Sequence, residues 1–498
     1  MSVAAVLPPS LSKEVRALAL PWLACVACML VVGVSNAPRL FGPLAIIAYV
    51  VGTSALGALS IGHEYTGRTL SLLLTLPTRR ERLLATKLGV LTVMLLTLWA
   101  AADALLFSGM PGPTDDKQMI ALIPLICGLF LAPWLTMACR SAIAGTVFAL
   151  TIPGVLMVVG ELLGVATYGH GRAMQAFWMT FVWSGTLGLC AIGAVMTWRT
   201  FTRLEAIEGP GPDVRLPRWL NAGSAAGTAA HVTKRSPVWL LVKKELRLQQ
   251  LPLVLTALYV LEWLAVVGLA SVSDPSYGYL FSGLTMLHVG LLPILIGSFA
   301  SAGERQLDTL QTQLLLPMAA SKQWAVKVGV VFGSAMVLGV GLPTLLLLLG
   351  RSVRVNVTPL TEWEPAIIAV MLLASGSLYI SSLCRSGLWA LVMSLPAVVG
   401  SALFLQLSFE WLANPTYFAV RRFTDGATLT ARPFYFLPPR ALSLLLIGGV
   451  IAIALRLAFI NHRSADRPAT RVWTQVIVMA TFVAAGIIAG AAWQALRS

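Results

Sequence analysis

Charged residues are scarce in this chain of 498 residues: they make up 11% of it, whereas a soluble globular domain carries about 25%. Hydrophobic residues make up 57%, and the mean hydropathy is +0.83. So few charges cannot cover a surface that faces water, so the composition excludes soluble, disordered and fibrous proteins. It predicts a polytopic membrane protein.

Reactive and metal-binding patterns are also missing. The six cysteines are scattered, mostly within apolar runs, and their spacing fits neither a metal site nor a disulfide framework. We interpret them as small packing residues. No Ser/His/Asp, Cys/His or paired-carboxylate pattern is present, so we predict no catalytic residue and no metal site.

An ATP-binding loop is the third absence. Such a loop needs a glycine-rich run that ends in Lys-Ser or Lys-Thr, and none of the eight lysines is followed by Ser or Thr. The longest polar stretch, Arg199–Gln250, is too short for an ATPase domain. We therefore expect the chain not to be an ATPase and to hold no cofactor itself.

What the chain does have is long apolar runs. A bilayer core needs about 20 apolar residues per helix, and backbone groups in lipid must be bonded within their own segment. We therefore predict an all-α protein with thirteen spans. The runs lie within residues 16–39, 39–63, 87–107, 117–140, 140–161, 172–199, 251–271, 274–304, 327–351, 364–385, 385–410, 441–460 and 472–496. The first is too long for a cleaved signal peptide, and Pro38 at its end disfavours cleavage.

The charges predict the orientation. If the N-terminus is cytoplasmic and the spans alternate, the cytoplasmic segments hold 25 of the 35 basic residues and 10 of the 20 acidic residues. Basic residues concentrate on the cytoplasmic side of membrane proteins. We expect a multi-pass protein of the cell (inner) membrane with a cytoplasmic N-terminus and an outer C-terminus. The basic excess then reflects topology rather than nucleic-acid binding.

The chain contains an internal repeat at an offset of 240 residues. In both copies a glutamate precedes a proline by 13 residues, and a lysine follows the proline by 10. The first copy contains Glu64, Thr69, Leu70, Leu74, Pro77 and Lys87, and the second contains Glu304, Thr309, Leu310, Leu314, Pro317 and Lys327.

Two shorter motifs repeat in the same order: Glu14-x-Arg16 with Glu245-x-Arg247, and Cys-Arg-Ser at 139–141 and 384–386. We predict two parallel six-helix repeats, related by a pseudo-twofold axis along the membrane normal, plus one extra C-terminal helix. The predicted domains are a first unit (1–208), a cytoplasmic Gly/Pro/Ala-rich linker (209–236), a second unit (237–461) and the extra helix (462–498).

Each repeated loop begins with a carboxylate and ends with a proline. Leucines recur between them at helical spacing, and proline stops a helix because it lacks the N–H and clashes with the preceding turn. We predict a short cytoplasmic helix in each loop, with Glu64 or Glu304 near its start, where a negative charge complements the helix dipole.

This duplicated E-x4-T-L…L-P…K pattern, within six-span units over about residues 10–461, resembles the type-2 permease subunits of ABC transporters. The resemblance implies that the loops are coupling helices, which dock onto two copies of a separate ABC ATPase that binds ATP and Mg. It also implies an amphipathic helix before the first span of each unit, at Leu11–Leu18 and Val238–Gln249. The fusion of two units and the thirteenth helix depart from the family pattern.

Two ionisable residues lie well inside predicted spans, at matching depths of about 18 Å. These are Glu262 and His288, and ionisable residues within spans are functional candidates. They form either a hydrogen-bonded pair that fastens two helices or a site for substrate or protons. We expect both side chains to face the bundle and to lie within hydrogen-bonding reach, directly or through one water.

The predicted function is thus the membrane permease of an ABC exporter. Its substrate is unknown; few charged groups line the spans, which favours a lipophilic or amphipathic molecule, and membrane lipid surrounds the protein. Two alternatives stay open: a proton-coupled secondary transporter that uses Glu262 and His288, and a non-transporting subunit that relays ATPase motion to a partner.

Overall fold

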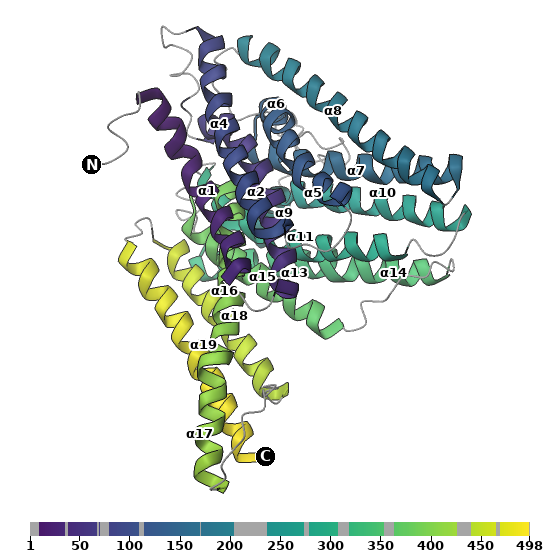
Figure 1. The fold of residues 1–498 in the computed structure, drawn as a ribbon. Helices are drawn as coiled ribbons and strands as arrows, with labels where there is room; N and C mark the ends of the chain where they lie inside the picture. The colour runs from purple at the N-terminus through teal and green to yellow at the C-terminus, as the bar shows by residue number, and fades with distance from the viewer. Residues whose placement is uncertain are drawn as a thin grey trace, which may run out of the picture. The chain divides into compact units, whose positions relative to one another are not determined.

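The computed structural model describes residues 9–34, 38–66, 69, 79–108, 114–169, 171–203, 237–272, 278–306, 318–352, 363–425, 440–464 and 469–497. Within these ranges the chain is helical, with no β-strand (Figure 1). The first helices are α1 (Pro9–Val34), α2 (Pro38–Thr66), α4 (Arg80–Ala102), α5 (Thr114–Ile126), α6 (Ala132–Cys139), α7 (Ala142–Tyr168) and α8 (Arg172–Thr202).

The later helices begin after the predicted linker, whose residues lie outside the described ranges. They are α9 (Pro237–Leu248), α10 (Gln250–Val272), α11 (Gly278–Gln306), α13 (Ala320–Met336), α14 (Leu342–Ser352), α15 (Trp363–Leu383), α16 (Gly387–Ser408), α17 (Asn414–Asp425), α18 (Arg440–His462) and α19 (Ala469–Arg497).

Thirteen segments among the described residues are long and apolar enough to cross a membrane. They coincide with the thirteen predicted runs, so the prediction of an all-α polytopic membrane protein is confirmed. The last of these segments, Thr470–Leu496, lies in α19 and is the predicted extra span. The pseudo-twofold symmetry and the orientation in the membrane stay predictions.

In the part of the chain that the structure describes, four spans contain a short π-helical segment, which the apolar pattern does not predict. These segments are η2 (Asp103–Phe107), η3 (Cys127–Leu131), η5 (Val337–Gly341) and η6 (Phe409–Ala413). A π-segment adds one residue to a helical turn, and it bends or rotates the next part of the helix. The spans with η3, η5 and η6 continue as α-helix after the π-segment, whereas η2 ends its span at Phe107.

The chain divides into two compact units, and each unit consists of two separate stretches of sequence. The first contains Met1–His288 and Pro343–Pro359, and the second contains Val289–Leu342 and Leu360–Ser498. The domain boundaries predicted from the sequence follow the internal repeat, whereas these units are defined by contacts in space. The predicted boundaries therefore stay a prediction.

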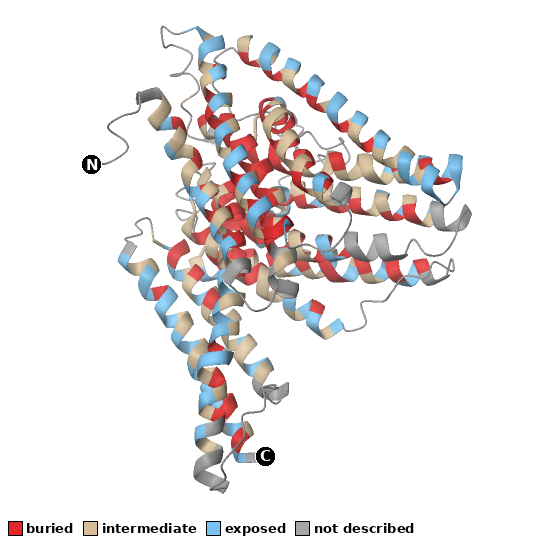
Figure 2. Ribbon diagram, viewed as in Figure 1, coloured by how far each residue is buried: buried red, intermediate tan, exposed pale blue. Residues whose placement is uncertain are grey.

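The second span is the centre of the first unit. In an 18-residue apolar window of the span, 83% of the residues are buried in α2, against 22% in α8, and Figure 2 shows the difference in colour. Helices α1, α4, α6 and α7 pack around α2. Because α2 ends at Thr66, the most enclosed helix of this unit carries Glu64 in its last turn.

Glycines let the second and fourth spans of each predicted repeat approach closely. A Cβ atom on Gly57 of α2 would overlap the carbonyl group of Gly128 in η3. A Cβ atom on Gly297 of α11 would overlap Ser377 of α15. Gly57 and Gly297 differ by the repeat offset of 240, although the motifs identified from the sequence did not include them.

The repeated Cys-Arg-Ser motif separates two helices in each case. Ser141 lies between α6 and α7, and its Oγ accepts a hydrogen bond from the N–H of Ala144 at 3.3 Å. Ser386 lies between α15 and α16, and its Oγ accepts from the N–H of Trp389 at 3.4 Å. The serine is thus the N-cap of the fifth span of each predicted repeat.

The two predicted amphipathic helices differ from each other. Val238–Gln249 corresponds closely to the separate helix α9. Leu11–Leu18, in contrast, is the first part of the long helix α1, which continues through Pro21. The prediction of a separate helix at Leu11–Leu18 was wrong. A proline inside a helix is tolerated when neighbouring helices hold the chain in place.

Candidate functional site

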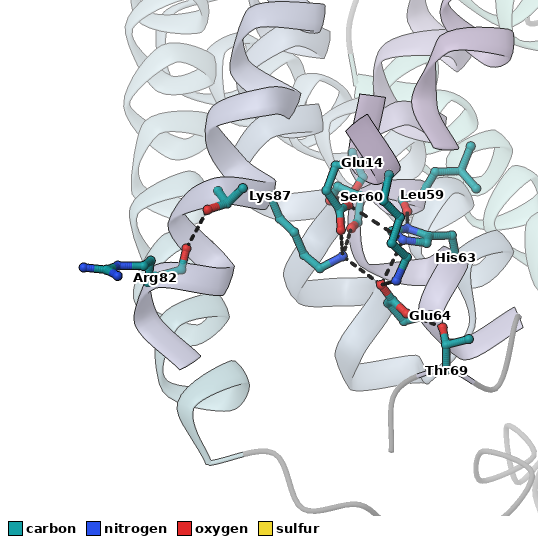
Figure 3. Close-up of polar contacts among 11 residues, drawn as sticks. Glu14, Leu59, Ser60, His63, Glu64, Thr69, Arg82 and Lys87 are labelled. Carbon is teal, nitrogen blue, oxygen red and sulfur yellow. Dashed lines mark hydrogen bonds and ion pairs between the residues drawn. The ribbon is translucent and has the colours of Figure 1, made fainter. Parts of the chain in front are cut away.

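The repeated glutamate and lysine form a buried ion pair in the first unit. Glu64 in the last turn of α2 and Lys87 in α4 are 0% and 2% exposed. Lys87 Nζ lies 3.1 Å from Glu64 Oε1 and 2.7 Å from Glu14 Oε1 of α1. The same ammonium group reaches the backbone carbonyl of Ser60 at 3.5 Å. Figure 3 shows Lys87 extending between the two carboxylates.

Two more groups contact the Glu64 carboxylate. Lys13 Nζ of α1 lies 2.9 Å from Oε1, and its side chain is 50% exposed. His63 Nε2 lies 3.0 Å from the same oxygen and 3.7 Å from Glu14. The His63 Nδ1 faces the carbonyl of Leu59 at 2.8 Å, which fixes the orientation of the ring. We call these residues, Lys13, Glu14, His63, Glu64 and Lys87, the first ion cluster.

Thr69, just after the end of α2, forms two hydrogen bonds to Glu64. Its backbone N–H donates to the Glu64 carbonyl at 3.0 Å, and its hydroxyl donates to the Glu64 carboxylate. Glu64 therefore holds both the start of the predicted coupling loop, through Thr69, and its far end, through Lys87. The contact between Glu64 and Thr69 joins two of the predicted site residues of this loop.

The carboxylates and His63 of the first ion cluster have donor atoms close enough for metal ligation, all within 4.8 Å of one another. The Lys87 ammonium group, however, lies within ion-pair distance of both carboxylates. Two carboxylates and two ammonium groups balance in charge, so the arrangement is satisfied as an ion-pair network. A metal ion here would have to displace Lys87.

The second unit contains a corresponding pair. Glu304 in α11 and Lys327 in α13 are both 0% exposed, and their charged atoms lie 2.7 Å apart. Lys327 also donates to the carbonyl of Ala300. The residues 60 and 300, whose carbonyls face the two lysines, differ by the repeat offset of 240. The lysine thus has the same kind of partners in both units.

The location of these glutamates differs from the prediction. Glu64 and Glu304 lie in the last turns of the long helices α2 and α11, whereas we expected them near the start of a short loop helix. The helical pattern continues two residues beyond each glutamate, so the span helix includes it. A carboxylate at a helix C-terminus opposes the dipole, and the buried lysine compensates for this.

The other seven predicted loop residues lie outside the described residues. These are Leu70, Leu74, Pro77, Thr309, Leu310, Leu314 and Pro317. The two predicted short helices also fall there and stay a prediction.

No protein family, curated protein or solved structure matches this chain. The interpretation of the site therefore depends on its own geometry and on the repeat in the sequence.

Glu262 and His288 lie on α10 and α11, as predicted. His288 is buried at 5% exposure, and Glu262 is half-buried. The His288 ring stacks on Tyr259 with centroids 4.1 Å apart, and the Tyr259 hydroxyl lies 2.9 Å from Thr285. The contact between Glu262 and His288, direct or through one water, stays a prediction.

The sequence showed part of the site and missed part of it. Lys87 and Lys327 belong to the repeat, and Glu14 belongs to a repeated motif that was assigned to a different role. His63 had no signal, because position 303 of the second copy is glycine. Glu14 and Lys13 are 73 and 51 residues from their partners Lys87 and Glu64, so only the packing of α1 on α2 and α4 brings them together.

Proposed function

We propose that this protein is the transmembrane permease of an ATP-driven exporter, with two cytoplasmic loops that dock onto a separate ATPase. The observation that carries the proposal is the buried glutamate–lysine pair at both repeated loops. In each, the glutamate ends one span, and the lysine lies in the first turns of the next. A loop whose two ends are joined by a buried ion pair moves together with both spans.

This arrangement suits the transmission of force. An ATPase that pushes on residues 65–79 or 305–319 would displace two helices as one body rather than deform a loose connection. In the first unit the displaced helices would be α2, the most enclosed span, and α4. The thirteen apolar helices fit a transporter-like membrane protein, and a lipophilic or amphipathic substrate suits spans with few charges.

Co-purification tests the partner. The full-length tagged chain, extracted from its native membrane, is expected to retain a P-loop ATPase. Photo-cross-linkers placed at Thr69 and at Lys322 should capture that ATPase, and one placed at the exposed Glu410 should not. Capture from neither loop would overturn the proposal.

Variants of the two glutamates test the coupling. We expect Glu64→Gln with Glu304→Gln to leave the ATPase bound but to reduce the stimulation of ATP hydrolysis by the chain. Glu81→Gln is the matched control, because Glu81 is an exposed acid in the first turn of α4. Equal stimulation in the double variant and the control would show that the glutamates do not take part in coupling.

Orientation is tested by cysteine labelling. Burial raises the pKa of the Cys384 thiol to about 12, and thiols react as thiolates, so this native cysteine should label poorly near neutral pH. A cysteine introduced at Thr69 or Lys322 should react with a membrane-impermeant maleimide only after the membrane is opened, and the unmodified chain is the control. Labelling of the introduced cysteine in intact cells would reverse the predicted topology.

A further inference from the structure

The thirteenth span is joined to the second unit by a buried amide pair. Gln475 of α19 is 5% exposed and Asn461 of α18 is 1% exposed. The Asn461 Nδ2 donates to Gln475 Oε1 at 3.0 Å, and the Gln475 Nε2 donates to Asn461 Oδ1 at 2.9 Å. Two amides that bond each other in both directions fix the distance and the rotation between their helices.

A third helix completes this network. The Tyr379 hydroxyl of α15 donates to Gln475 Oε1 at 3.0 Å. Asn461 Nδ2 also donates to Ser382 Oγ, near the end of α15, at 3.3 Å. All four side chains are buried, and a buried amide is costly unless it is bonded. The network therefore holds the ends of α15 and α18 and the first two turns of α19 in one arrangement.

Arg305 connects this arrangement to the second ion pair. Arg305 directly follows Glu304 in the last turn of α11, and its guanidinium group donates to three backbone carbonyls. One is that of Asn461 at 3.3 Å, one is that of Cys384 at 3.3 Å, and the third is that of Ser382. These carbonyls lie at the ends of α15 and α18, where helices leave carbonyl groups without partners in the helix.

The start of the second loop is thus held from two sides. Lys327 holds Glu304, and the ends of α15 and α18 hold Arg305. The position of α18 in turn depends on α19 through the amide pair. In the first unit the residue at the offset of 240 from Arg305 is Tyr65, which lacks the donors to gather three carbonyls.

We propose that Gln475 and Asn461 are positioning residues, through which the thirteenth span sets the position of Arg305 and of the second coupling loop. This inference rests on the proposed function for its consequence, the control of ATP hydrolysis. It also assigns a role to the helix that departs from the permease pattern. The two coupling loops are then unequal, because α19 acts on the second.

The test uses the full-length chain in lipid nanodiscs, alone and with the ATPase that co-purifies with it. The main variant is Gln475→Leu, which keeps the volume and removes the amide. Its matched control is Thr474→Val, because Thr474 is exposed and its hydroxyl bonds only within its own helix, to Thr470. The double swap Asn461→Gln with Gln475→Asn keeps both amides and their combined length.

Two measurements separate the steps. Amide hydrogen exchange of Ser301–Gln306 in the chain alone reports on the end of α11, where the N–H groups of Ser301 and Ala302 donate to Ser381 of α15. ATP hydrolysis by the complex reports on coupling. Couplings through packed networks change such quantities by about 2- to 30-fold.

We expect Gln475→Leu to speed exchange in Ser301–Gln306 and to lower the stimulated hydrolysis, each by about 2- to 30-fold. Thr474→Val should match the unmodified chain, and the double swap should restore both quantities. Arg305→Lys is the second variant if Gln475→Leu does not fold. It keeps the charge but cannot reach three carbonyls, and it should show the same two effects.

Unchanged exchange in both Gln475→Leu and Arg305→Lys would overturn the inference. Faster exchange with unchanged hydrolysis would also overturn it, because the position of Arg305 would then not matter for coupling. If no ATPase accompanies the unmodified chain, the proposed function fails. The exchange measurement still decides whether Gln475 positions Arg305.

Discussion

The two repeated glutamates have the same lysine partner but different surroundings. Around Glu64 the neighbours are charged: Lys13, Glu14 and His63 join Lys87, and one of them is half-exposed. In the last turns of α11, next to Glu304, Ser381 of α15 bonds the backbone of α11. Arg305 of α11 bonds backbone carbonyls at the end of α15. The same glutamate–lysine pair therefore occurs next to different side chains in the two units.

The comparison shows which parts of the motif the two units share. The glutamate, the lysine and the backbone carbonyl four residues before the glutamate occur in both units. The histidine is specific to the first copy, because position 303 is glycine. We interpret the shared parts as the link between the two spans.

Loss of the lysine should have the largest effect. Removing one partner of a buried pair costs about 3–5 kcal/mol, because it leaves a buried charge uncompensated. We expect Lys327→Met and Lys87→Met each to lower the free energy of unfolding by about that amount. SDS titration followed by tryptophan fluorescence measures both. A loss of about 0–1 kcal/mol in either variant, as for an exposed ion pair, would show that the buried pair does not join the two spans.

Glycine substitutions probe the close contact of the second and fourth spans. Gly57→Ala and Gly297→Ala should each cost about 1–3 kcal/mol, because the new methyl group would overlap neighbouring atoms. Gly89→Ala is the control, since nothing lies within 4 Å of its added Cβ. A similar loss in unfolding free energy at Gly57 and Gly297 would support the structural repeat. A neutral Gly297→Ala would limit the close contact to the first unit.

Removal of the capping serines should have a smaller and nearly equal effect. Ser141→Ala and Ser386→Ala each remove an N-cap, which typically contributes about 1 kcal/mol. Unfolding free energies of the two variants should agree within about 0.5 kcal/mol if the helix breaks are equivalent. A difference of more than that would indicate that the repeated Cys-Arg-Ser motif has unequal roles in the two units.

The exposed lysine should contribute least. Lys13→Ala removes an ion pair whose lysine is half-exposed, and such pairs contribute about 0–1 kcal/mol. We expect a small loss of unfolding free energy that shrinks further as salt rises, because exposed charges are screened. A loss as large as that of Lys87→Met, or one independent of salt, would show that Lys13 is part of the enclosed pair.

The sequence alone predicts the thirteen apolar helices and a glutamate and a lysine that recur at the same spacing in both loops. Span length follows from the thickness of the bilayer, which acts on each segment separately, so local composition was enough. The repeat singled out Glu64, Lys87, Glu304 and Lys327, and the structure showed that they form pairs. The repeat did not determine where the span helix ends, because the residues that follow the glutamates, Tyr65-Thr66 and Arg305-Gln306, carry no helix-stopping signal.

The groups that surround the two glutamate–lysine pairs depend on tertiary packing. The Lys13 and Glu14 contacts depend on the packing of α1 on α2 and α4, and the amide pair depends on that of α18 on α19. A polar residue inside an apolar helix must find a partner, but its helix offers many directions and neighbours. Which neighbour lies within 3 Å is set by helix rotation and crossing, which depend on all side chains at the contact.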